Sequence, residues 1–355
     1  MKKINQAVIL AGGEGQRLRP LTNTRPKPLL PVLDRPCLEY VIESLARAGI
    51  TDIFLTCSYR SSDIVDAVGN GEKLGVNIIY SFEEEPMGTA GAVKLLQDKL
   101  DERFIVASGD VLADVDITAL VNFHDEKSAE ATLALTEVSR PEEFGIVEID
   151  ELGKILRFKE KPAKEEIFSN LVNAGIYVLE RGVLEEIPFE EKFDFSKNLF
   201  PKLLANGRGV YGYKISGLWK DIGRPFDLLE ANLLMAQRIN RQSEKAIYGA
   251  QIERDQGGNV EPLEDSFLGR DVRLGSTSRI TSSVIGREST IGERTEIIDS
   301  LILARCTIFE ECMIEHCVVG EGCVIGPRVN ISGCVLGDGV LVEGPLSLKD
   351  VVKEP

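Results

Sequence analysis

A glycine-rich segment near the N-terminus carries a cluster of basic side chains. Residues 12–31 include four basic residues and one acidic residue, a net charge of +3 in a chain whose formal net charge is −16. Glycines let backbone N–H groups approach a phosphate closely, and Arg17 and Lys27 can neutralise its charge. Pro26 and Pro28 restrict the backbone on both sides of Lys27, so its ammonium is presented from a stiff segment. We therefore expect this loop to bind a polyphosphate.

Two known phosphate-binding motifs do not describe this loop. A dinucleotide fingerprint needs a third glycine after Gly13 and Gly15 and an acidic residue at the end of the second strand, which here ends in Thr56-Cys57-Ser58. A P-loop needs G-K-[ST], and the sequence has none. Arg19 and Arg25 are equally compatible with a phosphate contact and with a structural role.

The loop resembles the signature of the sugar-1-phosphate nucleotidyltransferase family. Its pattern is G-G-x-G-x-R-L-x-P-L-T followed by P-K-P, and further matches follow in family order. These matches lie at 86–92, 108–111, 144–147, 160–162, 173–177, Lys197 with 200–201, and 219–223. With the hexapeptide repeats that follow, the chain is most similar to the mannose-1-phosphate guanylyltransferase branch of this family.

The resemblance implies a role for each matched residue. Arg17, Lys27 and Asp110 would be catalytic, and Asp110 with Asp221 would bind Mg²⁺, the implied cofactor. The nucleotide-binding residues would be Ala11, Gly12, Gly13, Gly15, Glu83, Gly88 and Thr89, and the sugar-phosphate-binding residues Gly145, Glu160, Lys161, Asn173 and Lys197. The implied reaction joins GTP and mannose 1-phosphate to give GDP-mannose and pyrophosphate.

This reaction needs no general base. The second pKa of a phosphomonoester is about 6, so a sugar 1-phosphate is already anionic near neutral pH. His124 and His316, the only histidines in the sequence, need not take part, and we expect His316 to face solvent. The transfer needs alignment and charge neutralisation, and two carboxylates suit Mg²⁺, which prefers oxygen ligands and keeps several waters.

Glu83 bears on the choice of nucleotide. Thymidylyltransferases of the family carry a glutamine at this position. Guanine offers an N1–H and N2–H₂ edge that one carboxylate can accept, whereas thymine and uracil offer a single N3–H between acceptors. Glu83 therefore favours GTP, unless it faces solvent beside Glu84 and Glu85. No residue by itself distinguishes mannose from glucose, so a glucose-1-phosphate thymidylyl- or uridylyltransferase stays open.

The elements that must position these residues divide the chain in two. β-rich runs at 7–12, 52–58, 76–82, 103–110 and 131–138 alternate with helical stretches at 37–49, 61–71 and 90–100, and a last helix is expected at 225–240. This alternation predicts an α/β fold with a Rossmann-like, mostly parallel sheet sandwiched by helices, and ligands at the carboxyl ends of its strands. We expect a catalytic domain at 1–240, closed by that last helix, and a polar linker at 241–262.

The remainder, 263–355, repeats every 17 residues. Gly269, Gly286, Leu303, Gly320 and Gly337 end successive apolar triplets. A 17-residue turn predicts a three-sided parallel β-helix, and the stretch resembles the left-handed β-helix of hexapeptide repeats. We expect it to mediate homo-oligomer formation, because its flat faces and open end can be covered by another copy.

The same register predicts ladders of small residues inside the β-helix. One ladder would be Ser266, Ser283, Ser300, Cys317 and Cys334, and a second Ser289, Cys306, Cys323 and Val340. Neighbours would be about 4.8 Å apart. The chain has no C-x-x-C pair, so a metal site is not expected, whereas the redox state of these cysteines stays open.

Two hypotheses of another class are less favoured. A regulatory homologue that binds a nucleotide sugar without catalysis would be supported by loss of Arg17, Lys27, Asp110 or Asp221, and all four are present. An acyltransferase in the repeats would need a loop leaving the coils, and the unbroken register leaves no room for one.

Composition limits the partners. The length of 355 residues and the 43% hydrophobic content predict two packed domains. The charge of −16 disfavours nucleic acid and anionic membranes, and no apolar run approaches the roughly 18 residues of a membrane span or forms a signal segment. We expect a cytoplasmic protein whose partners are an NTP and a sugar 1-phosphate.

Overall fold

The computed structural model describes residues 4–83, 85–242, 251–252 and 263–354. Packing groups them into two compact units. The first holds the chain up to Gly13 and then Leu38–Trp219, and the second holds Glu14–Cys37 and the chain from Lys220 on. The glycine-rich loop and the last helix therefore pack with the repeats. The domain boundaries stay a prediction, since most of the linker at 241–262 lies outside the described residues.

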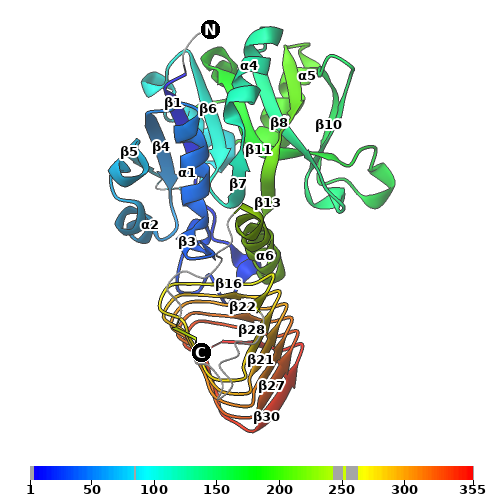
Figure 1. Ribbon diagram of the computed structural model, residues 1–355. Coiled ribbons are helices and arrows are strands. Elements are labelled where there is room, and N and C mark those ends of the chain that lie inside the picture. The colour runs from blue at the N-terminus through cyan, green and yellow to red at the C-terminus, as the bar shows by residue number, and fades with distance from the viewer. Residues whose placement is uncertain (1–3, 84, 243–250, 253–262, 355) are drawn as a thin grey trace. The chain divides into compact units, whose positions relative to one another are not determined.

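The first unit is built on a nine-stranded sheet (Figure 1). Its order is β10-β9-β11-β6-β1-β4-β5, with β8 paired to β11 and β12 paired to β8. The strands are β1 Gln6–Leu10, β4 Asp52–Cys57, β5 Asn77–Phe82, β6 Arg103–Ser108, β8 Ala131–Glu137, β9 Gly145–Ile149, β10 Ile155–Glu160, β11 Leu171–Glu180 and β12 Val210–Lys214. The parallel centre β6-β1-β4-β5 confirms the predicted α/β sheet, and β11 continues it antiparallel to β6.

Helices and two short strands accompany this sheet. They are α1 Cys37–Arg47, α2 Ser61–Val68, α3 Gly88–Lys94, α4 Ile117–Lys127 and α5 Phe200–Ala205, with the short strands β7 Val111–Val115 and β13 Gly217–Asp221. The helix predicted at 90–100 ends early, at Lys94, and a separate turn, Gln97–Lys99, follows it. Leu96 and Leu100 still reach the core from this turn.

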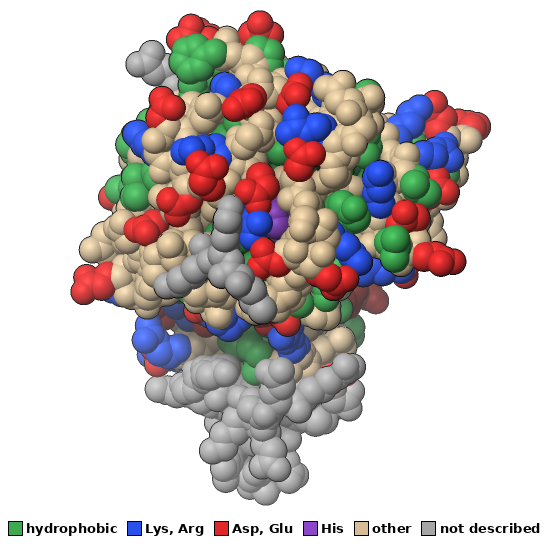
Figure 2. Space-filling model, turned by 90° about the horizontal axis from the view of Figure 1, so that it is seen from above, with side chains coloured by type: hydrophobic (Ala, Val, Ile, Leu, Met, Phe, Trp, Pro, Cys, Tyr) green, Lys and Arg blue, Asp and Glu red, His purple; other side chains and the backbone are tan. Residues whose placement is uncertain are grey.

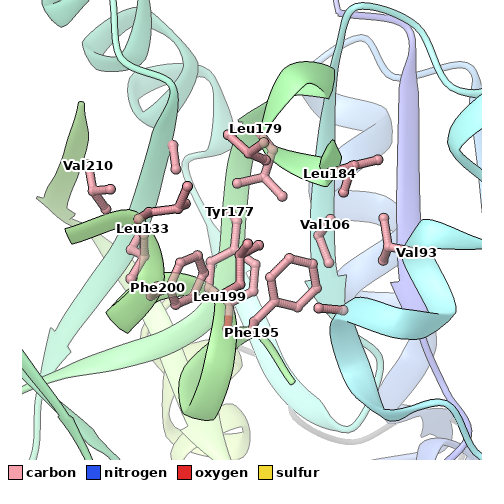
Figure 3. Close-up of a cluster of buried hydrophobic side chains, with 14 of the residues drawn as sticks. Val93, Val106, Leu133, Tyr177, Leu179, Leu184, Phe195, Leu199, Phe200 and Val210 are labelled. Atoms are coloured by element: carbon pink, nitrogen blue, oxygen red, sulfur yellow. The ribbon is translucent and has the colours of Figure 1, made fainter. Parts of the chain in front are cut away.

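One face of the sheet carries a large apolar core. Figure 3 shows side chains of β6, β8 and β11, among them Val106, Leu133 and Tyr177, meeting Val93 of α3 and Phe200 of α5. All five residues are buried. Because this core is continuous from α3 to α5, it fixes the loops that leave the carboxyl ends of the central strands.

The second unit contains a left-handed β-helix with three parallel six-stranded sheets. One sheet holds β14 Gln251–Ile252, β17 Arg273–Leu274, β20 Thr290–Ile291, β23 Thr307–Ile308, β26 Val324–Ile325 and β29 Leu341–Val342. The next holds β15 Leu263–Glu264, β18 Arg279–Thr281, β21 Glu296–Ile298, β24 Met313–Glu315, β27 Val329–Ser332 and β30 Leu346–Lys349. The third holds β16 Phe267–Leu268, β19 Val284–Ile285, β22 Leu301–Ile302, β25 Val318–Val319, β28 Val335–Leu336 and β31 Val352–Lys353.

The 17-residue register and the small-residue ladders are confirmed. Phe267 pairs with Val284, and Val284 with Leu301, in the third sheet. Inside the prism, a backbone N–H of one coil donates to the side chain 17 residues earlier. These bonds are Ser283 to Ser266 (3.1 Å), Ser300 to Ser283 (3.1 Å), Cys317 to Ser300 (3.0 Å), Cys334 to Cys317 Sγ (3.4 Å) and Cys306 to Ser289 (3.1 Å). All seven cysteines are buried, free thiols.

The last helix is present, but its partner is the β-helix. α6 Pro225–Gln242 contacts β19 and β25 of the third sheet. The outward side chains of that sheet are apolar and buried, namely Phe267, Val284, Leu301, Val318 and Val335. A strand with apolar residues on both faces must be covered on both, so α6 packs where this column needs cover.

His316 is exposed, as predicted, but one face of its ring has a partner. Its ring stacks on Phe226 of α6, with ring centroids 4.6 Å apart and planes 1° apart. Its Nδ1 lies 2.7 Å from Asp299 Oδ2. One face of the ring is therefore covered, although the side chain is still half-exposed.

Charged side chains of both signs lie on the surface of the first unit. Acidic and basic side chains are intermingled over the face of the first unit seen in Figure 2. In the part of the chain that the structure describes, every helix is too short or too polar to cross a membrane. Self-association through the β-helix stays a prediction.

Candidate functional site

The segment after β1 lies at the carboxyl ends of the parallel strands. The Ala11 N–H donates to the Thr56 carbonyl at 3.0 Å, and Ser58 Oγ donates to the Gly12 carbonyl at 2.7 Å. A Cβ on Gly12 would lie 2.8 Å from Ser58 Oγ, so a larger residue would not fit without movement, whereas Gly13 has open space beside it. The neighbouring strand β4 thus fixes Ala11 and Gly12.

Glu83 follows β5 and faces this segment. Its Oε2 accepts the Met87 N–H at 3.1 Å, and its Oε1 lies 3.8 Å from the position a Cβ on Gly12 would take. Burial raises the pKa of Glu83, and the Met87 hydrogen bond opposes that shift. Glu83 is half-buried while Glu85 is exposed. One carboxylate oxygen of Glu83 therefore lies near Gly12, and its contact with the base stays a prediction.

Gly88 and Thr89 join α3 to a distant segment. Gly88 has φ +74°, and a Cβ there would lie 2.7 Å from the Phe193 carbonyl. Thr89 donates to Asp194 from its N–H and its hydroxyl, at 3.2 and 3.3 Å, and its Oγ1 accepts the Phe195 N–H at 2.9 Å. The Thr89 hydroxyl therefore holds the segment that leads to Lys197, and its contact with nucleotide stays a prediction.

Gly145 and Glu160 meet as partners in the β9–β10 pair. A Cβ on Gly145 would lie 2.8 Å from Glu160 Oε2, so the glycine allows this carboxylate to approach the strand. Lys161 follows with φ +43°, and its N–H donates to the Phe144 carbonyl at 2.9 Å. The turn after β10 thereby fixes Lys161 beside Glu160.

A polar network connects Glu160 to Asn173. Asn173 Nδ2 donates to Tyr177 Oη at 2.9 Å and to Ser196 Oγ at 3.1 Å, and Ser196 also hydrogen-bonds Glu160. Lys197 comes next in the turn Phe195–Leu199. The five residues predicted to bind sugar phosphate thus lie around one network in the first unit. Ser196 was missed by the sequence analysis, because a serine beside Lys197 belongs to none of its motifs.

Neighbouring groups shift the pKa of Glu160 in opposite directions. Burial raises its pKa, the cations of Lys161 and Lys197 lower it, and Asp194 raises it again, so that the net shift is upward. A carboxylate with two lysines beside it can accept sugar hydroxyls while the lysines attract a phosphate. Binding of a sugar phosphate at this network stays a prediction.

Asp110 follows β6, next to the end of β1. The Gly109 N–H donates to the Leu10 carbonyl at 2.8 Å. Gly175 has φ +75°, and a Cβ there would lie 2.8 Å from Ser108 Oγ, so the β11 turn passes close to the same strand end. Asp110 therefore lies at the carboxyl end of the central strand β6, next to β11, the strand that carries Asn173.

In the second unit, Lys27 lies beside Asp221. Lys27 Nζ is 3.8 Å from Asp221 Oδ1, and the lysine side chain is only 9% exposed, although it ends in a charge. Thr22 Oγ1 donates to the Gly15 carbonyl at 2.9 Å. A Cβ on Gly15 would lie 3.0 Å from Lys27 Cβ. The glycine-rich loop therefore folds over the aliphatic stem of Lys27 and leaves its ammonium at the carboxylate.

Arg17 joins this group around Gly223. A Cβ on Gly223 would lie 2.8 Å from Asp221 Oδ2, 3.2 Å from Arg17 Nη2 and 3.4 Å from Asp227 Oδ2. Asp227 was missed by the sequence analysis, since a single acidic residue in the first turn of a helix is common. Arg17 and two carboxylates thus converge on a position that a side chain would fill, and Lys27 lies beside one of these carboxylates, Asp221.

The donor set agrees with a hard divalent cation. No group of three or more His, Cys, Asp or Glu side chains among the described residues is arranged to hold a metal. Mg²⁺ is commonly bound by one or two carboxylates plus waters and substrate phosphates. Asp221, with Asp227 near it in the second unit, has the oxygen donors for such a site, and the metal roles predicted for Asp110 and Asp221 stay predictions.

Two family models match the chain. The model described as nucleotidyl transferase matches residues 6–238. The model described as the EIF2B subunit epsilon LbH domain matches residues 246–348. The first match contains every candidate site residue, and the second contains most of the repeats.

Similar proteins are named for closely related reactions. A mannose-1-phosphate guanyltransferase of Yarrowia lipolytica is 38% identical over 260 residues, covering 72% of this chain and 70% of that protein. A mannose-1-phosphate guanylyltransferase of Mycobacterium tuberculosis is 35% identical over 281 residues, covering 77% of each. A UTP–glucose-1-phosphate uridylyltransferase of Synechocystis sp. is 38% identical over 242 residues, covering 64% of this chain and 62% of that protein, less than two thirds of its length.

A solved structure shares the fold of part of the chain. It is a crystal structure of a Bacillus anthracis protein assigned as a glucose-1-phosphate thymidylyltransferase, in complex with a sucrose. The identity is 30% and the TM-score 0.59, and the match covers 64% of this chain and 94% of that one.

Proposed function

The chain belongs to the nucleotidyl transferase family, and from this we propose that it transfers a nucleotidyl group from an NTP to a sugar 1-phosphate. The substrates that we propose are GTP and mannose 1-phosphate, and the products GDP-mannose and pyrophosphate. The observation that carries the reaction type is the buried Lys27 ammonium beside Asp221, with Arg17 next to it. Such a group suits a polyphosphate and the charge that develops on it.

The residues divide the work between binding and charge neutralisation. An oxygen of the sugar phosphate forms a bond to the α-phosphorus, the bond to the β-phosphate oxygen breaks, and pyrophosphate leaves with that electron pair. Lys27 and Arg17 would stabilise the negative charge on the α-phosphate and the leaving group. Asp110 and Asp221 would hold Mg²⁺, which supplies further charge neutralisation when bound. Lys161 and Lys197 would hold the sugar phosphate, and Glu160 would accept hydrogen bonds from sugar hydroxyls. Asn173 would contact them through its Oδ1, since its Nδ2 donates to Tyr177 and Ser196.

Glu83 supports GTP as the nucleotide. One of its carboxylate oxygens is used by the Met87 N–H, and the other faces Gly12. A carboxylate in this position can accept from the donor edge of guanine, whereas it would repel the acceptors of uracil or thymine. Relatives named as mannose-1-phosphate guanylyltransferases favour mannose, and the relative named as a uridylyltransferase makes UTP with glucose 1-phosphate the second candidate.

A pyrophosphate-release assay tests the proposal directly. We expect turnover with GTP and mannose 1-phosphate in the presence of Mg²⁺, and loss of turnover when the metal is removed by EDTA and recovery when it is added back. ATP, UTP and dTTP, each with mannose or glucose 1-phosphate, are the comparison pairs. Turnover with no pair would refute the enzyme, and efficient use of UTP or dTTP with negligible use of GTP would refute the guanylyl assignment.

The raised pKa of Glu160 predicts a pH effect on sugar binding. Burial shifts this pKa upward despite Lys161 and Lys197, while Asp194 adds to the shift and Ser196 opposes it. As pH falls, Glu160 therefore protonates before an exposed glutamate, whose pKa is about 4.3, and loses acceptor capacity. KM for the sugar phosphate should rise on acidification. Protonation of this residue does not itself unfold the chain, because a raised pKa means that the folded state binds the proton more tightly.

Glu160→Gln distinguishes this effect from general acid damage. The variant should have a high KM for the sugar phosphate at neutral pH, and the Glu160-dependent part of the pH profile should be missing. Glu165→Gln, on an exposed residue of the same region, is the matched control. Circular dichroism at each pH checks that the chain is folded. An unchanged pH profile in Glu160→Gln would contradict the assignment.

A further inference from the structure

Arg25 of the glycine-rich loop is held by two carboxylates of the β-helix. Its Nη2 lies 2.6 Å from Asp338 Oδ2 and also pairs with Glu321. The Thr24 hydroxyl hydrogen-bonds the same Asp338 carboxylate. The side chains of Glu321 and Asp338 are only 13% and 11% exposed. Together with Arg305, these residues form what we call the Arg25 cluster.

The carboxylates in the Arg25 cluster are themselves fixed. Asp338 Oδ1 accepts the Glu321 N–H at 2.7 Å, and Glu321 Oε1 pairs with Arg305 Nη2 at 2.6 Å. Burial alone would lower the pKa of Arg25, but attraction and hydrogen bonds from Asp338 and Glu321 outweigh it and raise that pKa. The guanidinium therefore stays charged, and its main contacts are with protein carboxylates. For Arg25 the sequence was compatible with a phosphate contact and with a structural role. The structure shows a structural role, since Arg25 pairs with Glu321 and Asp338.

A displacement of Arg25 would be transmitted to Lys27. Only Pro26 separates the two residues, and its ring fixes φ at −70°. Pro28 follows Lys27 inside the short helical turn Lys27–Leu29. Little rotation is available between the Arg25 anchor and the Lys27 side chain, which has Gly15 packed over its stem.

We propose that Arg25 is a positioning residue for nucleotidyl transfer, which uses Glu321 and Asp338 of the β-helix to hold Lys27 in place. The β-helix then contributes to catalysis, because two of its carboxylates determine the position of Lys27 through Arg25. This inference rests on the proposed function, because it assigns Lys27 to the triphosphate. A contact between the Arg25 cluster and substrate is not required.

The first arm of the test is kinetic. Arg25→Gln should lower kcat by about 10- to 100-fold, since a displacement of about 1 Å at a reacting group can cost 10²-fold. KM for the sugar phosphate should be unchanged, and Asp338→Asn should reproduce the loss. Arg294→Gln, which removes an exposed partner of Glu311 on the same β-helix, is the matched control and should retain activity. Thermal unfolding of each variant measures the structural contribution.

The second arm separates positioning from a general effect on stability. If Arg25 acts through Lys27, then Arg25→Gln should cost no further activity in the Lys27→Met background, so the two changes are strongly non-additive. Additive losses, or a full kcat in Arg25→Gln, would overturn the proposal. So would a loss that parallels unfolding and appears equally in Arg294→Gln.

A binding measurement keeps this inference separate from the proposed function. Calorimetry with inorganic triphosphate should show weaker binding in Arg25→Gln than in the unaltered chain, and no difference between Lys27→Met and the double variant. If the unaltered chain turns over no substrate pair, the proposed function fails while these binding comparisons still decide the role of Arg25. Equal triphosphate affinity in Arg25→Gln and the unaltered chain would contradict the positioning role.

Discussion

Lys27→Met is expected to lower kcat for nucleotidyl transfer by roughly 10²- to 10³-fold, the usual effect of removing one preorganised charge-stabilising donor. Lys27 is 9% exposed and lies 3.8 Å from Asp221, so its charge acts where little water screens it. Methionine keeps most of the aliphatic stem under Gly15 and removes the ammonium. Steady-state kinetics with the best substrate pair would measure the loss.

Folding must be checked separately for this variant. Removing Lys27 leaves the partly buried Asp221 without one cation, which can lower stability as well as activity. Circular dichroism and thermal unfolding would show whether the chain is still native at the assay temperature. Lys99→Met, at an exposed lysine of the turn Gln97–Lys99, is the control and should keep full activity. A native Lys27→Met protein with unchanged kcat would show that the loop motif has been misassigned.

Glu83→Gln should cost GTP about 10- to 100-fold in kcat/KM, because hydrogen bonds to a charged group contribute about 1.5–3 kcal/mol. A glutamine still offers an oxygen to the Met87 N–H, so the local fold should persist. Its NH₂ would face a donor of guanine where a carboxylate oxygen was available. For UTP and dTTP the same change removes a repulsive charge, so their kcat/KM should rise. The ratio of kcat/KM for GTP to that for UTP or dTTP should therefore fall for two reasons.

The neighbouring sequence offers a matched control for Glu83. Glu85→Gln removes the same charge two residues away from an exposed position, and the ratio of kcat/KM values for GTP and dTTP should not change. Competition assays with both nucleotides present would measure this ratio directly. A ratio that is identical in Glu83→Gln and the unaltered chain would exclude Glu83 as the base-reading residue.

Local patterns predicted most of the fold. The runs at 52–58 and 103–110 became β4 and β6, because alternating strand and helix patterns depend on nearby residues. The 17-residue step predicted the β-helix and its ladders for the same reason, since each coil repeats one set of contacts with its neighbour. The motifs also identified Glu160, Asn173 and Lys197, which the structure places around one network.

Non-local contacts were outside the reach of these patterns. Arg25 and Glu321 are 296 positions apart, so the sequence around Arg25 does not indicate that Glu321 is its partner. α6 was expected to close the sheet domain because it follows it in sequence, but its apolar face covers a column of the third β-helix sheet. Ser196 and Asp227 gain their significance only from the residues that folding brings beside them.

The regular 17-residue repeat of the β-helix sets the distance between two points at which it holds the glycine-rich loop and the segment after it. Asp34 Oδ1 accepts the Arg287 N–H at 3.0 Å, and Arg25 is held by Glu321, which is 34 residues, or two repeats of 17, beyond Arg287. One coil inserted between those two points would move one anchor by about 4.8 Å relative to the other. Coils added after Val342 would leave both anchors in place. The number of coils between Arg287 and Glu321 is therefore constrained by the loop, whereas length added after Val342 does not disturb it.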